Sequence, residues 1–481
     1  MELLNRKKTG KVERPVKVLQ FGEGNFLRAF VDYMIDIANE QGKFNGDIVL
    51  VKPIEFGSLD RFHDQECQYT VQLRGIVDGE PKRINRIVTS VADAVDAYGE
   101  YQKYADYAKL DSLRYIVSNT TEAGIVYDAS CKFEDTPPAS YPAKLTQFLY
   151  RRFKNFGAEE GKGFVILSCE LIDNNGKELE KCVLKYIEQW NLEPEFKAWV
   201  EKENIFCSTL VDRIVTGYPR SEADEINKEN NYVDNIIDTG EIFGFWVIEG
   251  PEFLKTELPF DKANLPVLIT DDHKPYKQRK VRILNGAHTS MVLGAYLAGQ
   301  DIGAGFIPDT LNTAIYDEII PTLTLPKDEL MDFAHSVTER FKNPFIDHAL
   351  LSISLNSTSK WKARVMPSLL GYVEKNVTLP ACIAASFAFY IAFYNGNKLT
   401  DAGLIAERNG NEYTVMDDRA VLEFFYNHRN DSNSELVHAV MTNTDFWGRD
   451  LTEIKGFEKA VCEYLEDTKT NGAYEVMKKL I

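Results

Sequence analysis

Over the first 270 residues, short apolar runs alternate with stretches of helical periodicity. The apolar runs predict buried strands at Val16–Phe21, 48–51, 114–118, 164–167, 243–248 and 266–270. Helical patterns cover 31–37, 93–109, 141–156 and roughly 177–203, and a hairpin around Asp78-Gly79 is predicted over 68–77 and 83–91. Strands that alternate with helices are typical of a sheet covered by helices, so we expect an α/β domain here.

From about residue 280 the pattern changes to long amphipathic stretches. Helices are predicted at 280–298, 310–322, 327–341, 345–356, 360–371, 380–394, 417–428, 434–443, 456–467 and 472–480. The segments 395–397 and 409–411, both Asn-Gly-Asn, are interpreted as loops. The sequence therefore predicts an α/β domain over 1–270 and a mostly helical, all-α domain over 271–481, with the boundary between 266 and 275.

Composition narrows the class of protein. The net charge is −18, and no basic cluster follows the pattern of a phosphate-binding surface, so nucleic acid and anionic membrane are poor partners. The seven cysteines form no C-x-x-C pair, and neither a signal peptide nor the ~18-residue apolar run of a membrane span is found. We expect a cytoplasmic protein with reduced thiols, and no ligand spacing supports a catalytic metal.

A glycine-containing turn follows the first predicted strand and leads into the first helix. Gly22 and Gly24 let the backbone approach a pyrophosphate, and the helix N-terminus offers unpaired N–H groups. The third glycine of G-x-G-x-x-G is Leu27, so an ordinary tight turn is an equally good explanation. As a cofactor site, the turn comprises Val18, Leu19, Gln20, Phe21, Gly22, Glu23, Gly24, Asn25, Phe26, Leu27, Arg28 and Ala29.

Two later strand ends add to this candidate site. Asn119 and Thr120 follow the strand at 114–118, at the kind of edge where α/β sheets bind ligands, although a capped turn explains them equally well. After the strand at 48–51, an NAD site usually has an acid for the ribose hydroxyls, but here Lys52 follows. A lysine could tolerate a 2′-phosphate, so this position leaves NAD and NADP both open.

The segment from Lys280 to His288 carries a cation, an amide and an imidazole among apolar residues. On an α-helix at ~100° per residue, Lys280, Asn285 and His288 would occupy less than half of the circumference. Lys280 could act as general acid or base, Asn285 could donate to a developing alkoxide, and His288 could position either partner. A solvated helix face is the simpler explanation, but the apolar neighbours favour burial, and a buried lysine with a lowered pKa suits proton transfer.

The pattern Lys280-x4-Asn285-x2-His288 resembles the catalytic signature of the polyol-specific long-chain dehydrogenases, the mannitol dehydrogenase family. The glycine turn and the blocks VDRI (211–214) and RF-x-NP (340–344) are also similar to that family. Within it, the likeness is greatest to members acting on sugar acids, through QFGEGNFLRAF (20–30), SNTTEAGI (118–125), CELID (169–173), FCSTLVDRIVTGYPR (206–220) and LNGAHT (284–289). The resemblance implies a Rossmann-type N-terminal domain, a helical C-terminal domain, catalysis in the cleft between them, and reduction of a sugar-acid ketone by NADH.

One departure from the polyol members concerns the reacting oxygen. Those enzymes carry a Cys-Asp-Asn string whose Asn helps to bind that oxygen, whereas this chain has Leu171 at the position of the Asn. Asn285 would then act alone, or Asn174 or Asn175 would substitute.

A second departure concerns the substrate's carboxylate. Polyol members place an arginine where this chain has Ser352. A sugar acid brings a carboxylate, for which Lys360 and Arg364 are the candidate partners. Arg213 is a weaker candidate, and a surface or structural role is an equally good explanation for each cation. Asp212 and Arg213 are also predicted to contact the substrate, although a structural ion pair explains this acid and arginine in an apolar setting at least as well.

Three functional hypotheses follow from the sequence. The first is a metal-independent, NAD-dependent sugar-acid reductase with Lys280 as general acid; a fructuronate reductase or a mannitol-type dehydrogenase is the alternative within the family, against which the missing Cys-Asp-Asn string argues. The second is a non-catalytic nucleotide-binding sensor, against which the intact Lys-Asn-His set argues. The third is a helical scaffold with an unrelated α/β domain that would not bind NADH.

Overall fold

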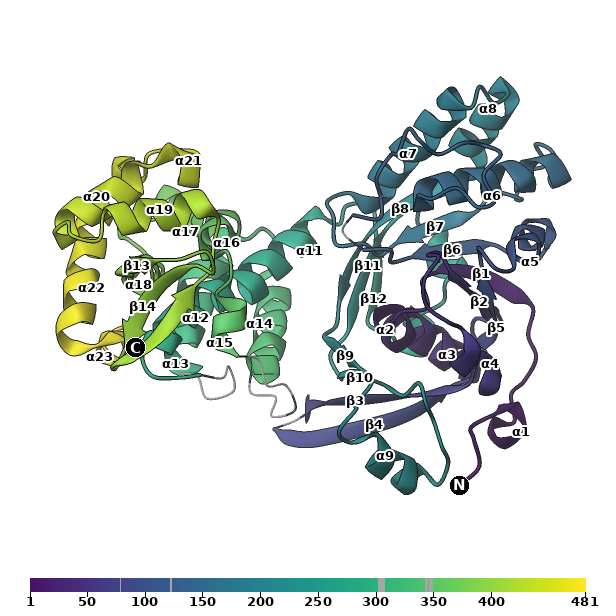
Figure 1. Ribbon diagram of the computed structural model, residues 1–481, viewed down its shortest axis with the longest axis horizontal. Coiled ribbons are helices and arrows are strands. Elements are labelled where there is room, and N and C mark those ends of the chain that lie inside the picture. The colour runs from purple at the N-terminus through teal and green to yellow at the C-terminus, as the bar shows by residue number, and fades with distance from the viewer. Residues whose placement is uncertain (78, 122, 302–307, 342–344, 346–348) are drawn as a thin grey trace. The chain divides into compact units, whose positions relative to one another are not determined.

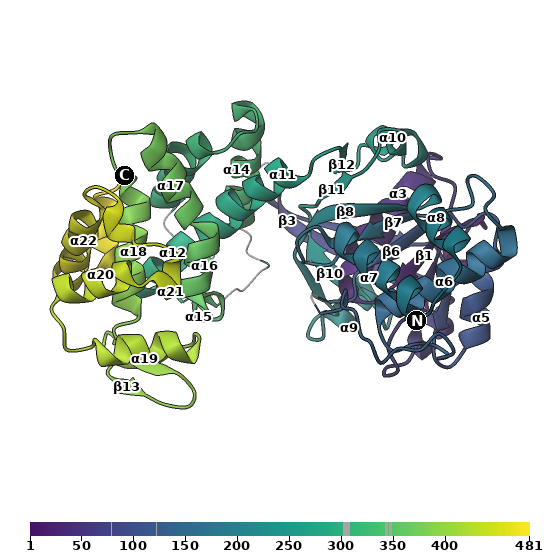
Figure 2. The ribbon, with the colours of Figure 1, turned by 90° about the horizontal axis from the view of Figure 1, so that it is seen from above.

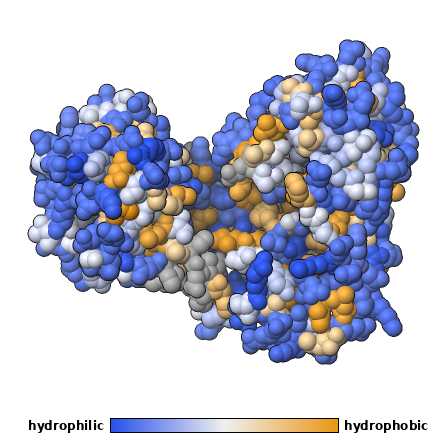
Figure 3. Space-filling view, viewed as in Figure 1, coloured by the Kyte–Doolittle hydropathy of each residue, from blue (hydrophilic) through white to orange (hydrophobic). Residues whose placement is uncertain are grey.

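The computed structural model describes the chain except for residues 78, 122, 302–307, 342–344 and 346–348. The described residues form two compact units (Figure 1). The first comprises Met1–Gly75 and Lys82–His273, and the second comprises Ile76–Pro81 and Lys274–Ile481. On the side shown in Figure 3, both units present a mainly hydrophilic surface, as the net charge of −18 leads one to expect. Among the described residues, none of the helices combines the length and the apolarity needed to cross a membrane.

The first unit is built on an eight-stranded sheet with the order β12-β11-β8-β7-β6-β1-β2-β5 within the described residues. Its strands are β1 (Val16–Phe21), β2 (Asp47–Lys52), β5 (Val91–Asp96), β6 (Tyr115–Ser118), β7 (Val165–Ser168), β8 (Ile205–Asp212), β11 (Phe245–Glu249) and β12 (Val267–Thr270). The strands from β5 to β8 run parallel, and β11 is antiparallel to β8. The run β5-β2-β1-β6-β7-β8 has the strand order of dinucleotide-binding folds, in which the order reverses between the first and fourth strands, here β1 and β6.

Successive side chains of the central strands enter two different cores, because a strand presents alternate residues to opposite faces. Val18 of β1 packs with η1 (Arg28–Asp32) and α3 (Tyr33–Glu40). Leu19 and Phe21 pack on the other face. The helices of that face are α5 (Tyr101–Asp106), α6 (Tyr141–Phe156), α7 (Asn175–Gln189) and α8 (Pro194–Glu203), of which the last three lie together in Figure 2. The unit therefore has the three layers that the alternating pattern predicts.

The predicted helix at 93–109 is wrong at its beginning. Residues Val91–Asp96 form β5, which pairs in parallel with β2, and the helix begins only at Tyr101. Val91, Ala94 and Val95 are fully buried in the two cores, so their spacing fits a strand covered on both faces as well as it fits a helix. Pairing with β2 decides between the two.

The predicted hairpin is present, although Asp78 at its turn lies outside the described residues. Its strands β3 (Tyr69–Val77) and β4 (Glu80–Val88) belong to a second sheet with the order β4-β3-β10-β9 among the described strands. The other two are β9 (Val215–Gly217) and β10 (Asp238–Glu241).

The second unit is mainly helical and is organised around α18 (Ala381–Phe393), which is buried on nearly every side. Helices α12 (Ala287–Leu297) and α22 (Phe457–Asn471) pack against it. The other long helices are α14 (Lys327–Phe341), α16 (Ser357–Arg364), α17 (Met366–Lys375), α19 (Arg419–Asn427) and α20 (Asn433–Thr442).

A small sheet interrupts the predicted all-α pattern. Strands β13 (Lys398–Leu399), β14 (Leu404–Arg408) and β15 (Asn411–Val415) form an antiparallel meander. Asn409 and Gly410 join the last two strands with φ of 52° and 81°. Two positive φ values in a two-residue Asn-Gly connection are the signature of a type I′ hairpin turn, so interpreting this segment only as a loop missed a strand pair.

The N-terminus of α18 is capped by an acid from another helix. Glu318, in the π-helix η6 (Ala314–Ile319), accepts the backbone N–H groups of Cys382 and Ile383, each at 2.8 Å. Pro380 at the N-cap position contributes no side-chain hydrogen bond. Burial raises the pKa of Glu318 to about 7 despite these two N–H donors.

We expect Glu318→Ala to lower the free energy of unfolding by about 1–3 kcal/mol, because two buried N–H groups lose their acceptor. Glu318→Gln keeps one acceptor oxygen and should cost less. Since the pKa of Glu318 in the folded chain lies above its ordinary value of 4.5, wild-type stability should fall as pH rises from 4.5 to about 7. Glu318→Gln should flatten that slope in urea unfolding measured across this range. The exposed neighbour Asp317→Asn is the control and should change stability by less than about 0.5 kcal/mol.

Candidate functional site

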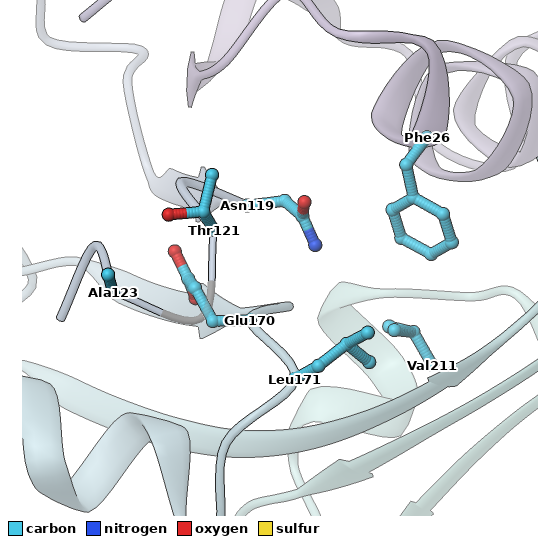
Figure 4. Close-up of a pocket in the computed structure, with 7 residues that line it drawn as sticks. All are labelled: Phe26, Asn119, Thr121, Ala123, Glu170, Leu171 and Val211. Atoms are coloured by element: carbon cyan, nitrogen blue, oxygen red, sulfur yellow. The ribbon is translucent and has the colours of Figure 1, made fainter. Parts of the chain in front are cut away.

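A cavity of about 510 Å³ lies at the carboxyl ends of the central strands, where the strand order reverses. It is lined by Phe26, Asn119, Thr121, Ala123, Glu170, Leu171 and Val211. Figure 4 shows the polar side chains of Asn119, Thr121 and Glu170 grouped on one side and the apolar side chains of Phe26, Leu171 and Val211 on the other. This reversal point is where open α/β sheets bind ligands. An amphipathic lining of this kind suits a ligand with both a ring and polar groups.

The glycine turn that borders the cavity needs its first glycine. Gly22 has φ of 120°, which side chains rarely adopt, and a Cβ there would lie 3.4 Å from the Asn119 carbonyl oxygen. Gly24 precedes α2 (Asn25–Leu27), which continues through η1 into α3, and a Cβ on Gly24 would meet nothing within 4 Å. Leu27, which replaces the third glycine, is buried, and its side chain closes over Gly22. The turn thus leaves open space beside a helix N-terminus, as a pyrophosphate requires.

Two of the predicted ligand-binding arginines are used inside the first unit. Arg28 is 5% exposed and donates to the Ile236 carbonyl (2.7 Å) and to Oδ1 of Asn25 (2.6 Å). Arg213 is 8% exposed and donates to the carbonyls of Ala29 (2.6 Å) and Phe243 (3.0 Å). These bonds are structural, because they tie the helix after the glycine turn to neighbouring strands and loops.

Asp212, the last residue of β8, is also buried. It lies opposite Phe245 in the register of β8 and β11. The predicted substrate roles of Asp212 and Arg213 stay predictions.

Asn119 and Thr120, which follow β6, form hydrogen bonds to the residues that follow β7. The Asn119 side chain donates to the Cys169 carbonyl at 2.6 Å, and both the N–H and the hydroxyl of Thr120 donate to Glu170 Oε1 at 3.1 Å. Glu170 Oε2 is buried and has no hydrogen-bond partner among the described residues. Burial raises the pKa of Glu170.

Glu170 is the site residue that sequence reasoning passed over. The available signal was its place directly after a buried strand, which is the same signal that singled out Asn119.

Asn175 does not replace the Asn that this chain lacks from the Cys-Asp-Asn string of the polyol members. Its side chain donates to the carbonyls of Glu170 and Thr209 and accepts from the N–H of Thr209, so it is committed to the backbone. Leu171, at the position of the missing amide, is 64% exposed and lines the cavity instead. Asn174 precedes α7 in a left-handed conformation.

Lys280 and Asn285 lie on a π-helix rather than on the expected α-helix. The π-helix η4 spans Lys280–Gly286, between α11 (Lys274–Arg279) and α12. Its i→i+5 hydrogen bonds connect backbone positions with the spacing of Lys280 and Asn285, so the ~100° per residue of an α-helix does not describe how these side chains are arranged. Short π-helical segments occur frequently at functional sites. Lys280, Asn285 and His288 are all half-buried, which is less than the sequence predicts.

Helix α16 packs closely against the segment Lys280–Gly286. A Cβ on Gly286 would lie 2.8 Å from the Arg364 carbonyl oxygen, so glycine is needed for the close approach. His288 packs its ring at 5.0 Å from that of Phe341, at the end of α14. The family-like block that begins at Arg340 continues into residues 342–344, which lie outside the described residues.

Lys360 and Arg364, the two candidate partners of the substrate's carboxylate, differ in the contacts that they already make within the chain. Lys360 donates to the Ile353 carbonyl at 2.9 Å, and its pKa is lowered by burial and by Arg364. Arg364 Nη1 lies 3.4 Å from the hydroxyl of Thr289, the residue after His288. Burial lowers the pKa of Arg364, and no carboxylate pairs with it among the described residues. Arg364 is therefore a half-buried cation beside the Lys-Asn-His segment.

Comparison with known proteins assigns the chain to a family. Residues 16–262 match the mannitol dehydrogenase Rossmann domain, and residues 272–469 match the mannitol dehydrogenase C-terminal domain. The chain belongs to the mannitol dehydrogenase family. The resemblance and the fold class inferred from the sequence are thereby confirmed.

Within the mannitol dehydrogenase family, full-length relatives include the altronate oxidoreductases of Escherichia coli O7:K1 and of Shigella flexneri. Each is 44% identical over 492 residues, with 100% of both chains covered. Among solved structures, a substrate-free D-sorbitol dehydrogenase matches with a TM-score of 0.78 at 18% identity, covering 99% of this chain and 100% of that one. Pseudomonas fluorescens mannitol 2-dehydrogenase, solved with NAD and D-mannitol, matches with a TM-score of 0.69 at 20% identity, covering 100% and 99%. At these identities the two structures support the fold alone.

Proposed function

We propose that this chain is an NAD-dependent oxidoreductase that interconverts D-tagaturonate and D-altronate, in the cytoplasm and within galacturonate breakdown. The observation that carries the proposal is the Lys280, Asn285 and His288 set on one helical segment of a mannitol dehydrogenase family chain. The 44% identity to altronate oxidoreductases over the full length of both chains supports the choice of substrate.

The first unit fits a dinucleotide. The open glycine turn and the cavity at the strand-order reversal would hold it, with Asn119 in the cavity lining and Thr120 bonded to the lining residue Glu170. Bound NAD would supply or accept the hydride at the substrate carbon. Residues of the second unit would donate or accept the proton and would stabilise the charge on the oxygen.

In reduction, the Lys280 ammonium donates a proton to the oxygen of the substrate ketone as it becomes a hydroxyl; in oxidation, the neutral amine takes that proton back. Asn285 donates a hydrogen bond to the same oxygen and stabilises its developing negative charge. His288, held against Phe341, positions the substrate or the amine. We also propose that Arg364 binds the substrate's carboxylate, because it is half-buried and carries no carboxylate partner of its own among the described residues. Lys360 is the weaker choice, since its ammonium already binds the Ile353 carbonyl.

Oxidation of NADH with three substrates tests the assignment. We expect tagaturonate to give the highest kcat/KM, fructuronate a lower value and fructose, which has no carboxylate, the lowest. A preference for fructuronate or fructose would move the chain to another member of the same family. NADH binding without turnover of any of the three would instead favour the nucleotide-binding sensor, and absence of saturable NADH binding would favour the scaffold.

A further inference from the structure

Lys52 stands at the carboxyl end of β2, where dinucleotide-binding folds usually carry the acid that binds the adenosine ribose. On sequence alone, a lysine here is compatible with the extra phosphate of NADP. In the structure its side chain is 1% exposed. The role of Lys52 therefore depends on which groups its buried ammonium contacts.

The ammonium of Lys52 is fully used within the chain. Nζ donates to the carbonyls of Ile54 (2.7 Å), Glu55 (3.3 Å) and Phe56 (3.4 Å), and it lies 3.2 Å from Asp96 Oδ2. A lysine ammonium has three protons, so these contacts leave none for a further ligand.

The same contacts shape the loop that follows β2. Three consecutive carbonyls turn inward to one ammonium, and β5 holds that ammonium from the other side, because Asp96 is the register partner of Lys52. The loop then presents Ile54 and Phe56 outward, 55% and 79% exposed. Exposed apolar side chains at the ligand-binding edge of the sheet are the surface that an adenine ring would cover.

Two carboxylates, those of Asp96 and Glu23, lie at this edge. Asp96 pairs with Lys52. Glu23, between the two glycines of the turn, is half-buried; burial raises its pKa, and Lys52, Arg28 and Asp96 are charged groups near it. Carboxylates accept hydrogen bonds from ribose hydroxyls but repel a phosphate dianion.

We propose that Lys52 positions the loop at the adenosine end of the site instead of binding a 2′-phosphate, and that Glu23 and Asp96 make the site select NADH over NADPH. The acid that usually ends β2 is thus replaced by carboxylates from the glycine turn and from the end of β5. This inference rests on the proposed NAD-dependent function and assigns the residues that set the preference for that dinucleotide.

Direct titration of the full-length protein with NADH and with NADPH, by calorimetry, tests the proposal without any turnover. Wild type should bind NADH at least about tenfold more tightly than NADPH. Glu23→Gln removes one negative charge and should narrow that ratio. Lys52→Gln should weaken both dinucleotides together, because the loop loses its anchor, and Lys52→Arg should recover part of the affinity. The exposed Lys43→Gln is the matched control and should leave both affinities unchanged.

The outcomes separate the inference from the proposed function. Tighter binding of NADPH by wild type, a selective loss of NADPH binding in Lys52→Gln, or an unchanged ratio in Glu23→Gln would each overturn the inference while leaving a dinucleotide enzyme. If Lys52→Gln fails to fold, the wild-type ratio and the Glu23→Gln ratio still decide. Binding of neither dinucleotide would remove the proposed function, and the inference with it.

Discussion

Replacing Lys280 with alanine should lower kcat for tagaturonate reduction by about 10²- to 10⁴-fold, which is the usual contribution of a positioned general acid. The affinity for NADH should stay close to wild type, because the glycine turn and its cavity are built from the first unit alone. Stopped-flow measurement of NADH oxidation, together with NADH titration by fluorescence, would separate the two effects.

Lys280→Arg distinguishes proton transfer from charge alone. Arginine keeps the positive charge but does not give up its proton in proteins, so we expect this variant to be nearly as slow as Lys280→Ala. Lys274→Ala, at the exposed start of α11, serves as the control and should keep the wild-type rate. A near-normal kcat in Lys280→Ala would remove the lysine from the mechanism.

Arg364→Gln should lower kcat/KM for tagaturonate by about 10- to 100-fold, mainly through KM. The reason is that a hydrogen bond to a charged group contributes about 1.5–3 kcal/mol. Reduction of fructose, which has no carboxylate, should not fall in parallel. Arg364→Lys keeps the charge but loses the two-pronged geometry of the guanidinium, so its loss should be intermediate.

Arg282 offers a matched control for this experiment. It is half-buried on η4, burial lowers its pKa too, and Nη1 lies 3.3 Å from the Thr322 hydroxyl. Arg282→Gln should affect tagaturonate and fructose equally, if at all. Equal losses on the two substrates in Arg364→Gln would show that this arginine does not bind the carboxylate.

Several elements of the candidate site were predictable because their signals are local. The strand Val16–Phe21, the turn at Gly22 and the strand that ends before Asn119 follow from apolar runs bounded by small or polar residues. The Lys280, Asn285 and His288 set was visible as spacing within nine residues of chain. The geometry of this set could not be predicted from the sequence, because a π-helix and an α-helix share the same sequence pattern.

Other features depend on partners that are distant in sequence. The sequence predicts a helix where β5 lies, because only the pairing of β5 with β2 distinguishes the two conformations. The sequence predicts that Arg28 and Arg213 bind ligands, whereas in the structure both donate to backbone carbonyls of other elements.

By itself, the sequence determined an α/β unit followed by a helical one, the family, and a short list of groups able to move a proton, since each of these depends on periodicity or on residues close together in the chain. Only the tertiary structure decided which charged groups are already satisfied. Lys52 is the clearest case: three carbonyls that follow it and an aspartate 44 positions later occupy an ammonium that the sequence leaves open to a phosphate. The physical reason is that a buried charge is governed by the groups packed around it, and these are placed only when the following loop turns its carbonyls inward and the sheet brings Asp96 beside Lys52.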